Sequence, residues 1–281
     1  MHALGDFSLT VVNGGNFRLD GGAMHGVVPK TLWSKLVSCD DQNRCEYATN
    51  CLYVEGRGVR MLIETGNGDK LSPRQKEVFG IDHDRAVAGA LTEAGIDPAS
   101  IDLVVLSHLH FDHVGGATVR KGNAIVPVFP RARHVVQKRE WQAAMAPHER
   151  NRASYLQENL GPLREAGLLD LVDGEAELAP GVRVLPTPGH TPGHQSVLID
   201  GGGQRALFCG DVAPTSVHVR LPYIMAYDLD VEATLESKRG LWQRAIAEDW
   251  LCVFGHDCAC HAARLGLDAS GQPAVTATEN L

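Results

Sequence analysis

The sequence predicts an α+β fold in which two mixed β-sheets pack together and helices cover the outside. Three observations support this prediction. Strand patterns alternate with helical patterns, which is typical of sheets that contain parallel strands. Hairpin patterns also occur, and hairpins require antiparallel neighbours. The chain has 281 residues and no long Pro/Gly/Ser-rich linker, so we expect one domain over residues 1–281.

The first part of the chain contains two predicted hairpins. One joins Phe7–Val12 to Phe17–Leu19 through the Asn-Gly-Gly-Asn segment between them. The other joins Asn50–Val54 to Val59–Ile63 through the Glu-Gly-Arg-Gly segment between them. Both pairs predict antiparallel strands near the N-terminus.

The next elements alternate between helix and strand. Apolar residues recur at helical spacing from about Asp84 to Ala94, and Gly95 ends the predicted helix. The continuous apolar run Ile101–Leu106 predicts a strand that is buried on both faces. A helical segment at about residues 148–167 is predicted to form a lid or to face the substrate.

The last part of the chain returns to strands. A long helix is predicted from about Val231 to Asp249, and the tail over about residues 268–281 has weak patterning and is predicted to be flexible. The predicted strands of this part are Val182–Leu185, Ser196–Ile199, Ala206–Cys209 and, as the final strand, Leu251–Phe254.

Charge and composition exclude several classes of function. The formal net charge is −8 and like charges form no block, which argues against nucleic acid and anionic membranes as partners. No apolar run approaches the roughly 18 residues that a membrane span needs. We therefore expect a small-molecule partner.

The cysteines and the N-terminus predict a reducing environment. The chain has seven cysteines, an odd number, and they lack the paired Cys-x-x-Cys knuckles of a zinc ribbon. The first residues do not show the basic, apolar and small-residue order of a signal peptide. We therefore expect free thiols in a cytoplasmic protein.

The segment from His108 to His113, which reads His-Leu-His-Phe-Asp-His, carries the chemistry. It directly follows a predicted buried strand. On a loop, His108 and His110 can face one cation while Asp112 and His113 face a neighbouring one. Imidazole nitrogens and carboxylate oxygens suit zinc, and also iron or manganese. The alternative, a solvated histidine-rich loop, fits this specific spacing less well.

Three further candidate ligands each follow an apolar strand and stand beside a glycine. They are His190, Asp211 and His256. Any one of them alone is more typical of a turn that ends a strand. Together they bring loops from four strand ends to one edge of the predicted sheets, so the sequence predicts a metal site at that edge.

This pattern resembles the metallo-β-lactamase superfamily of metallohydrolases, over the span from Ile63 to Asp257. The resemblance implies an αβ/βα sandwich with two divalent metal ions at one edge, zinc first among the candidates and manganese or iron as alternatives. It also implies that Asp211 bridges the two ions. The other implied ligands are His108, His110 and His190 for one metal and Asp112, His113 and His256 for the other.

One position departs from the family pattern. The superfamily usually has Asp-Thr-Gly after its second hairpin, whereas this chain has Glu64-Thr65-Gly66. The usual carboxylate supports a metal ligand without binding the metal itself. Glu64 is one methylene longer and can still accept a histidine N–H. A carboxylate that faces water at the end of the strand is an equal alternative.

Two metals about 3.5–4 Å apart can hold a bridging water and present hydroxide at neutral pH. Such a centre hydrolyses esters, lactones, thioesters or phosphodiesters. Asp211 or Asp112 would transfer the proton to the departing alkoxide.

Two local sequences resemble the branch of quorum-quenching lactonases that open N-acyl homoserine lactones. They are Gly26–Lys30 with Trp33, and Met225-Ala226-Tyr227-Asp228. Better-known lactonases carry a tyrosine three residues after the bridging aspartate, where this chain has Pro214. A catalytic phenol would then come from Tyr223 or Tyr227, and for each of them a buried ring that only packs is the alternative.

The entrance of the site is predicted to be apolar and to suit a neutral cyclic ester with an apolar tail. His218 is expected to be a solvated loop histidine, with substrate contact as the alternative. The apolar residues could instead fill the core or the interface of a homodimer. The predicted lining residues are Val27, Val28, Trp33, Leu221, Tyr223, Ile224 and Met225.

Other members of the superfamily supply the alternative functions. A thioester hydrolase of the glyoxalase II type would need basic residues for glutathione, of which the C-terminal part has few. RNA-processing relatives fit the acidic charge balance poorly. A non-hydrolytic redox or metal-binding protein of the same fold is the remaining class, although di-iron oxygen reductases have glutamate where this chain has His110.

Overall fold

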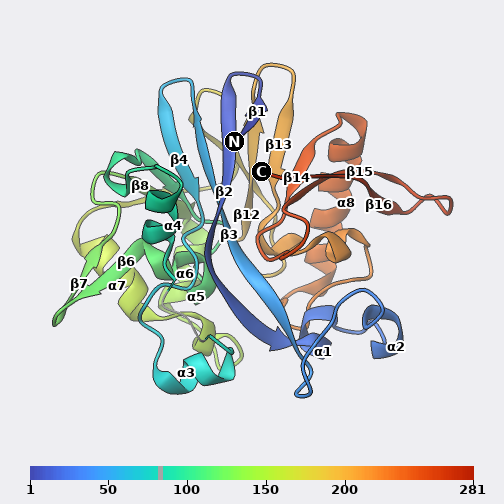
Figure 1. Ribbon diagram of the computed structural model, residues 1–281, viewed down its shortest axis with the longest axis horizontal. Coiled ribbons are helices and arrows are strands. Elements are labelled where there is room, and N and C mark those ends of the chain that lie inside the picture. Colours follow the sequence, from blue (N-terminus) through green and yellow to red (C-terminus); the bar gives the residue numbers. More distant parts are fainter. Residues whose placement is uncertain (82–84) are drawn as a thin grey trace.

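The computed structural model describes residues 1–81 and 85–281 and contains two seven-stranded sheets that face each other (Figure 1). In the first sheet the strands from β1 to β4 are antiparallel, and those from β4 to β9 are parallel. In spatial order its strands are β1 (His2–Leu4), β2 (Phe7–Asp20), β3 (Arg44–Gly56), β4 (Val59–Ile63), β5 (Leu103–Val105), β8 (Arg133–Gln137) and β9 (Leu169–Val172).

The second sheet is also mixed. Its one parallel pair, β13 with β14, lies between antiparallel strands on either side. Its strands are β10 (Ala176–Ala179), β11 (Val182–Pro186), β12 (Gln195–Asp200), β13 (Arg205–Phe208), β14 (Leu251–Val253), β15 (Ala262–Leu267) and β16 (Pro273–Glu279). A separate hairpin pairs β6 (Thr118–Lys121) with β7 (Ala124–Pro127).

Helices cover both outer faces of the pair of sheets. The first sheet packs against α4, α6 and α7, and the second against α8. The α-helices are α1 (Gly21–His25), α2 (Lys30–Trp33), α3 (Pro73–Val78), α4 (Val87–Glu93), α5 (Phe111–Val114), α6 (Lys138–Met145), α7 (Gln157–Glu165) and α8 (Val231–Ala247). The 3-10 helices are η1 (Pro98–Ser100), η2 (Gly115–Ala117), η3 (Arg152–Ser154), η4 (Gly210–Val212) and η5 (Ser216–Val219).

The side chains of β5 alternate between two apolar cores, one on each face of the first sheet. Leu103 and Val105 point into the apolar core between the two sheets, whereas Val104 points into the core under the helices. Because both faces of the strand are buried, its sequence is continuously apolar. The predicted fold, two mixed sheets inside helices in an αβ/βα sandwich, is confirmed.

The first predicted hairpin is wrong, whereas the second is confirmed as β3 and β4. Residues 7–20 form the single strand β2, whose register against β3 shifts between Asn13 and Asn16. The Asn-Gly-Gly-Asn segment is therefore a β-bulge, in which Gly15 has φ of 126°. Pairing with the long strand β3 prevails over the local turn preference of the segment.

The C-terminal tail also differs from the prediction. Residues 273–279 form the edge strand β16, which pairs with β15, and the flexibility of the tail stays a prediction. β14, predicted to be the final strand, is consequently followed by two more strands. The weak pattern of the tail reflects an edge strand that is largely exposed, which shows little alternation between apolar and polar residues.

Two further predictions need correction. Cys39 and Cys45 form a disulfide, so the prediction of free thiols is wrong for this pair; their backbones form an antiparallel bridge that brings the two side chains together. The predicted helix 84–94 begins at Val87 in the structure, and Asp84 lies outside the described residues.

None of the helices in the described part of the chain has the length and apolar character that a membrane span requires.

Candidate metal centre

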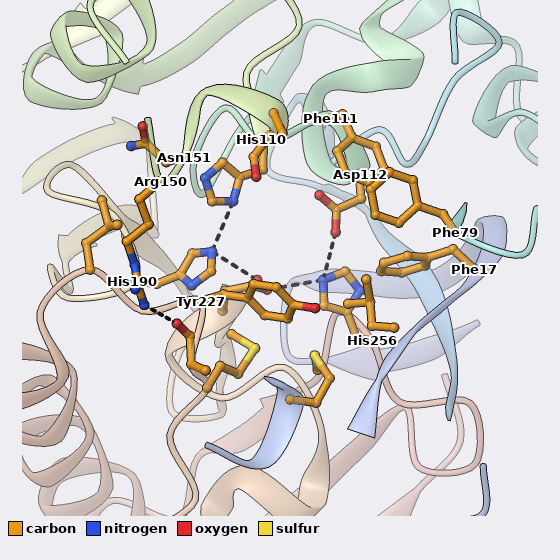
Figure 2. Close-up of a pocket in the computed structure, with 18 residues that line it drawn as sticks. Phe17, Phe79, His110, Phe111, Asp112, Arg150, Asn151, His190, Tyr227 and His256 are labelled. Carbon is orange, nitrogen blue, oxygen red and sulfur yellow. Dashed lines mark hydrogen bonds and ion pairs between the residues drawn. The ribbon is translucent and has the colours of Figure 1, made fainter. Parts of the chain in front are cut away.

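The predicted ligands lie together at the ends of four strands. The segment His108–His113 follows β5, and its last residues begin α5. His190 follows β11, Asp211 lies on η4 after β13, and His256 follows β14. The structure therefore brings together all of the sequence-predicted ligands from both sheets, and Figure 2 shows several of them around one cavity.

One group consists of His108, His110 and His190, whose ligand atoms lie within 4.8 Å of one another. The Nδ1 atom of His110 is 3.1 Å from the Nε2 atom of His190. That same Nε2 atom is 3.3 Å from Oδ2 of Asp211.

The second group consists of Asp112, His113 and His256. The Nε2 atoms of His113 and His256 are 3.1 Å apart, and each of them is 3.6 Å from Oδ2 of Asp112. Oδ1 of Asp211 lies 3.4 Å from Nε2 of His113 and 3.2 Å from Nε2 of His256. The two oxygens of Asp211 thus face different groups.

The tautomers of the histidines test whether these residues fit metal ions. Nδ1 of His190 contacts Oδ1 of Asp228 at 2.8 Å, and Nδ1 of His256 contacts the carbonyl oxygen of Ala48 at 2.7 Å. Both partners are acceptors, so each Nδ1 donates and each Nε2 is turned toward the centre. The Nε2 atoms of His190 and His256 thus face the other candidate ligands at 3.1 Å. The buried Nε2 of His108 also has no partner in the structure. The donor set fits divalent metal ions.

The charges of these groups agree with metal binding. Burial and the neighbouring histidines lower the pKa of His108 and His110 well below the usual value, so both rings are neutral. Burial alone would raise the pKa of Asp211. The surrounding His113, His256 and His190 outweigh that effect and hold its pKa well below the usual range. Burial alone would lower the pKa of His113, His190 and His256, but the charge of Asp211 outweighs it and raises the pKa of all three. Neutral imidazoles and an ionised carboxylate are the forms that bind metal, so a bound cation would replace the protons of these three rings.

The sequence analysis missed the role of Asp228. It is 3% exposed, and one of its oxygens holds His190 in the tautomer that turns Nε2 toward the centre. Asp228 was part of the lactonase-like segment 225–228, but no local pattern could show that it reaches a histidine 38 residues away.

Glu64 and Glu140 contact the segment that carries His108, His110 and His113 and do not belong to the donor groups. Glu64 is buried, its Oε1 accepts the backbone N–H of Ser107 at 2.9 Å, and its Oε2 is 3.4 Å from Nδ1 of His113. The alternative of a water-facing carboxylate is therefore wrong. Oε1 of Glu140 accepts the N–H of Leu109 and the hydroxyl of Tyr155, whose ring lies edge-on to His110. Nothing in the sequence pointed to Glu140.

The two candidate tyrosines and His218 differ in whether they line the cavity. Tyr227 lines the cavity and is 39% exposed, whereas Tyr223 is buried in an apolar cluster and does not line it. His218 is neither solvated nor a cavity residue. It is buried between Thr215 and the carbonyl oxygen of Met24, and its burial lowers its pKa to about 3. Its role is structural.

The cavity over the centre has a volume of about 370 Å³. Of the seven predicted lining residues only Met225 contributes; Trp33, for example, is buried against His25 instead. The apolar character was predicted correctly, but apart from Met225 other residues provide it. They are Phe17, Leu19, Met24, Phe79, Phe111, Met225, Ala226 and Leu229.

The predicted helical segment 148–167 contains η3 and α7, and its first residues line the same cavity. These lining residues are Arg150, Asn151, Ala153 and Ser154. The segment thus faces the cavity, and its function as a lid stays a prediction.

Replacing Asp228 by alanine is expected to weaken zinc binding by about 10–100-fold, because His190 loses the acceptor that holds its ring. Asp228→Asn keeps an amide oxygen at this position and should weaken binding less. Competition against a chromogenic chelator measures the affinity. Asp173→Ala, which removes an exposed carboxylate after β9, is the control. Unchanged zinc affinity in Asp228→Ala would show that His190 needs no such support.

Comparison with known proteins gives relatives with known names. N-acyl homoserine lactonase from Bacillus sp is 31% identical over 174 residues, which cover 61% of this chain and 62% of the relative. The matched region thus spans less than two thirds of that relative. N-acyl homoserine lactonase from Bacillus cereus is 32% identical over 218 residues, which cover 74% of this chain and 80% of the relative.

Solved structures show the same fold. A probable metal-dependent hydrolase from Staphylococcus aureus has a TM-score of 0.91 and 32% identity, with all of both chains covered. AidC, a dizinc quorum-quenching lactonase in complex with a product, has a TM-score of 0.81, with 100% of this chain and 97% of that chain covered. At 19% identity, the likeness to AidC is one of fold.

A family model described as the metallo-beta-lactamase superfamily matches residues 46–256. This range contains every predicted ligand and strands of both sheets. The chain belongs to the metallo-β-lactamase superfamily.

Proposed function

We propose that this protein is a metal-dependent hydrolase that opens a lactone or ester, with N-acyl homoserine lactones or close analogues as the first candidates. The observation that carries the proposal is the pair of donor groups that share Asp211 beneath a largely apolar cavity. The similarity to N-acyl homoserine lactonases supports the choice of substrate class.

Two divalent cations, zinc first among them, would be held by the two donor groups, with Asp211 between them. When bound, they supply Lewis acidity and make hydroxide available from water at neutral pH. The remaining steps belong to the residues of this chain. Asp211 or Asp112 accepts the proton of the attacking water and returns it to the departing alkoxide.

Tyr227 would assist at the reacting carbonyl. It lies at the centre of the cavity between His190 and His256 (Figure 2). Burial, together with the charges of Asp20 and Asp112, raises the pKa of its phenol to about 12, so the hydroxyl stays protonated at neutral pH. A protonated phenol can donate a hydrogen bond to the developing oxyanion.

The apolar wall would hold the acyl tail of the substrate. It includes Phe17, Phe79 and Phe111, which lie beside Asp112 and His256 (Figure 2). Apolar lining with a few polar groups is usual for small-molecule sites. It suits a neutral cyclic ester with an apolar tail better than a phosphodiester.

The value of kcat/KM for N-acyl homoserine lactones is expected to rise with the length of the acyl chain. Each methylene that the cavity buries contributes up to about 0.8 kcal/mol, or roughly fourfold, until the tail leaves the cavity. Kinetics with the series from butanoyl to dodecanoyl lactones measure this dependence, beside a glutathione thioester and an aryl phosphodiester.

Phe79→Ala is expected to flatten this dependence, because it removes part of the apolar wall. The matched control is Leu32→Ala, which changes an exposed apolar residue that does not line the cavity. Faster turnover of the thioester would instead favour an enzyme of the glyoxalase II type. A zinc-loaded protein that hydrolyses none of these compounds would contradict the proposed function.

A further inference from the structure

Arg150 has an unusual place in the cavity. It lies in the segment between α6 and η3, lines the cavity and is exposed. Its Nη2 atom donates a hydrogen bond to the carbonyl oxygen of Ala226, which joins the 148–154 segment to the 222–230 loop. The guanidinium lies on the same side of the cavity as His190 (Figure 2).

The charge of Arg150 is not balanced by a neighbouring side chain. In the described part of the chain, no carboxylate lies within 4.0 Å of its guanidinium, and the adjacent Glu149 pairs with Arg152 instead. A guanidinium offers five N–H donors, and the contact with Ala226 uses one. Among the described lining residues outside the candidate metal ligands, Arg150 carries the one formal charge.

The cavity therefore has two unlike sides. The aromatic wall of Phe17, Phe79 and Phe111 lies near Asp112 and His256, whereas Arg150 lies on the side of His190 (Figure 2). The reacting centre stands between them. A substrate that spans the cavity would meet apolar surface at one end and an uncompensated positive charge at the other.

We propose that Arg150 binds a carboxylate carried by the substrate, so that the preferred substrates are lactones or esters with an apolar group on one side and a carboxylate on the other. This inference rests on the proposed hydrolase function and departs from its first candidates, since N-acyl homoserine lactones are neutral and carry no carboxylate. The planar fork of a guanidinium matches a carboxylate with two parallel hydrogen bonds, which a lysine cannot reproduce. Partial exclusion of water at the cavity edge strengthens such a pair relative to one in bulk solvent.

The test compares two matched aryl esters of adipic acid. One carries a free carboxylate at its far end, and the other carries the methyl ester of that carboxylate. The zinc-loaded wild-type protein is expected to favour the free acid by about tenfold in kcat/KM, the magnitude of a partly exposed charge-assisted hydrogen bond. The preference should shrink as ionic strength rises.

Variants separate recognition from structure. Arg150→Met keeps an unbranched side chain but removes the charge and the N–H donors, and should abolish the preference. Arg150→Lys keeps the charge and should retain part of it. Arg152→Met is the matched control, since Arg152 is exposed and does not line the cavity, and it should keep the full preference. A loss in Arg150→Met that is equal for both esters would mean that Arg150 only joins the two segments, and would overturn the proposal.

Binding without turnover distinguishes this inference from the proposed function. Calorimetry with monomethyl adipate should show binding that weakens about tenfold in Arg150→Met, whether or not any ester is hydrolysed. Equal affinity of both proteins for this probe would overturn the inference. If the probe binds through Arg150 and no lactone or ester is turned over, the proposed function fails and the carboxylate site stands.

Discussion

Replacing Asp211 by asparagine is expected to lower kcat/KM by about 10³-fold or more, the order seen when a preorganised charge is removed from a catalytic centre. The two oxygens of Asp211 face the two donor groups, so the amide would lose both the negative charge and one acceptor. The fold should persist, because asparagine has nearly the same shape. Steady-state kinetics at saturating zinc, together with a thermal melt by circular dichroism, measure the two effects.

Asp257→Asn is the matched control for this prediction. Asp257 neighbours His256, but its oxygens accept backbone N–H groups of Ser216, Ala259 and Cys260 rather than facing the donor groups. Its replacement should lower the melting temperature more than the turnover. An Asp211→Asn protein with near wild-type turnover would show that Asp211 is not shared between two metals.

Removal of metal is expected to abolish hydrolysis, with a loss of at least about 10³-fold, and zinc in slight excess should restore it. Elemental analysis after reconstitution should give two zinc ions per chain, because the two oxygens of Asp211 face His190 on one side and His113 with His256 on the other. Asp112→Ala removes a donor from one set and should leave one ion per chain. Glu149→Ala, which changes a carboxylate with 92% side-chain exposure, should leave two. One ion per chain in the reconstituted wild-type protein would contradict the two-metal proposal.

The donor set could be predicted from sequence because its members share a local signature. Each stands directly after a short apolar strand, and the segment from His108 to His113 carries four donors in six positions. The chemical types of these residues limit what they can bind. The strand positions then place them at a common edge, since neighbouring strand ends meet there.

The supporting residues lacked such a signature. Asp228 and Glu140 act through contacts with residues that are distant in the sequence, and an isolated carboxylate in a loop or helix is usually solvated. The residues that line the cavity could not be predicted from local patterns either. Phe17 reaches it because β2 continues through its bulge, and a hairpin at Asn13–Asn16 would have placed it elsewhere. Both features depend on contacts between residues that are distant in the sequence, which local preferences do not show.

The separation of the donors along the chain has a consequence for folding. His113 and His256 are 143 positions apart, and His110 and His190 are 80 apart. Contacts of such high sequence separation form slowly, since loop-closure entropy must be overcome before they stabilise the chain. His256 is further held by backbone hydrogen bonds to Pro214, in the loop after η4, and to Ala48 on β3. The four donors from His108 to His113 are close together in the sequence, but the complete set of donors forms only when both sheets have docked.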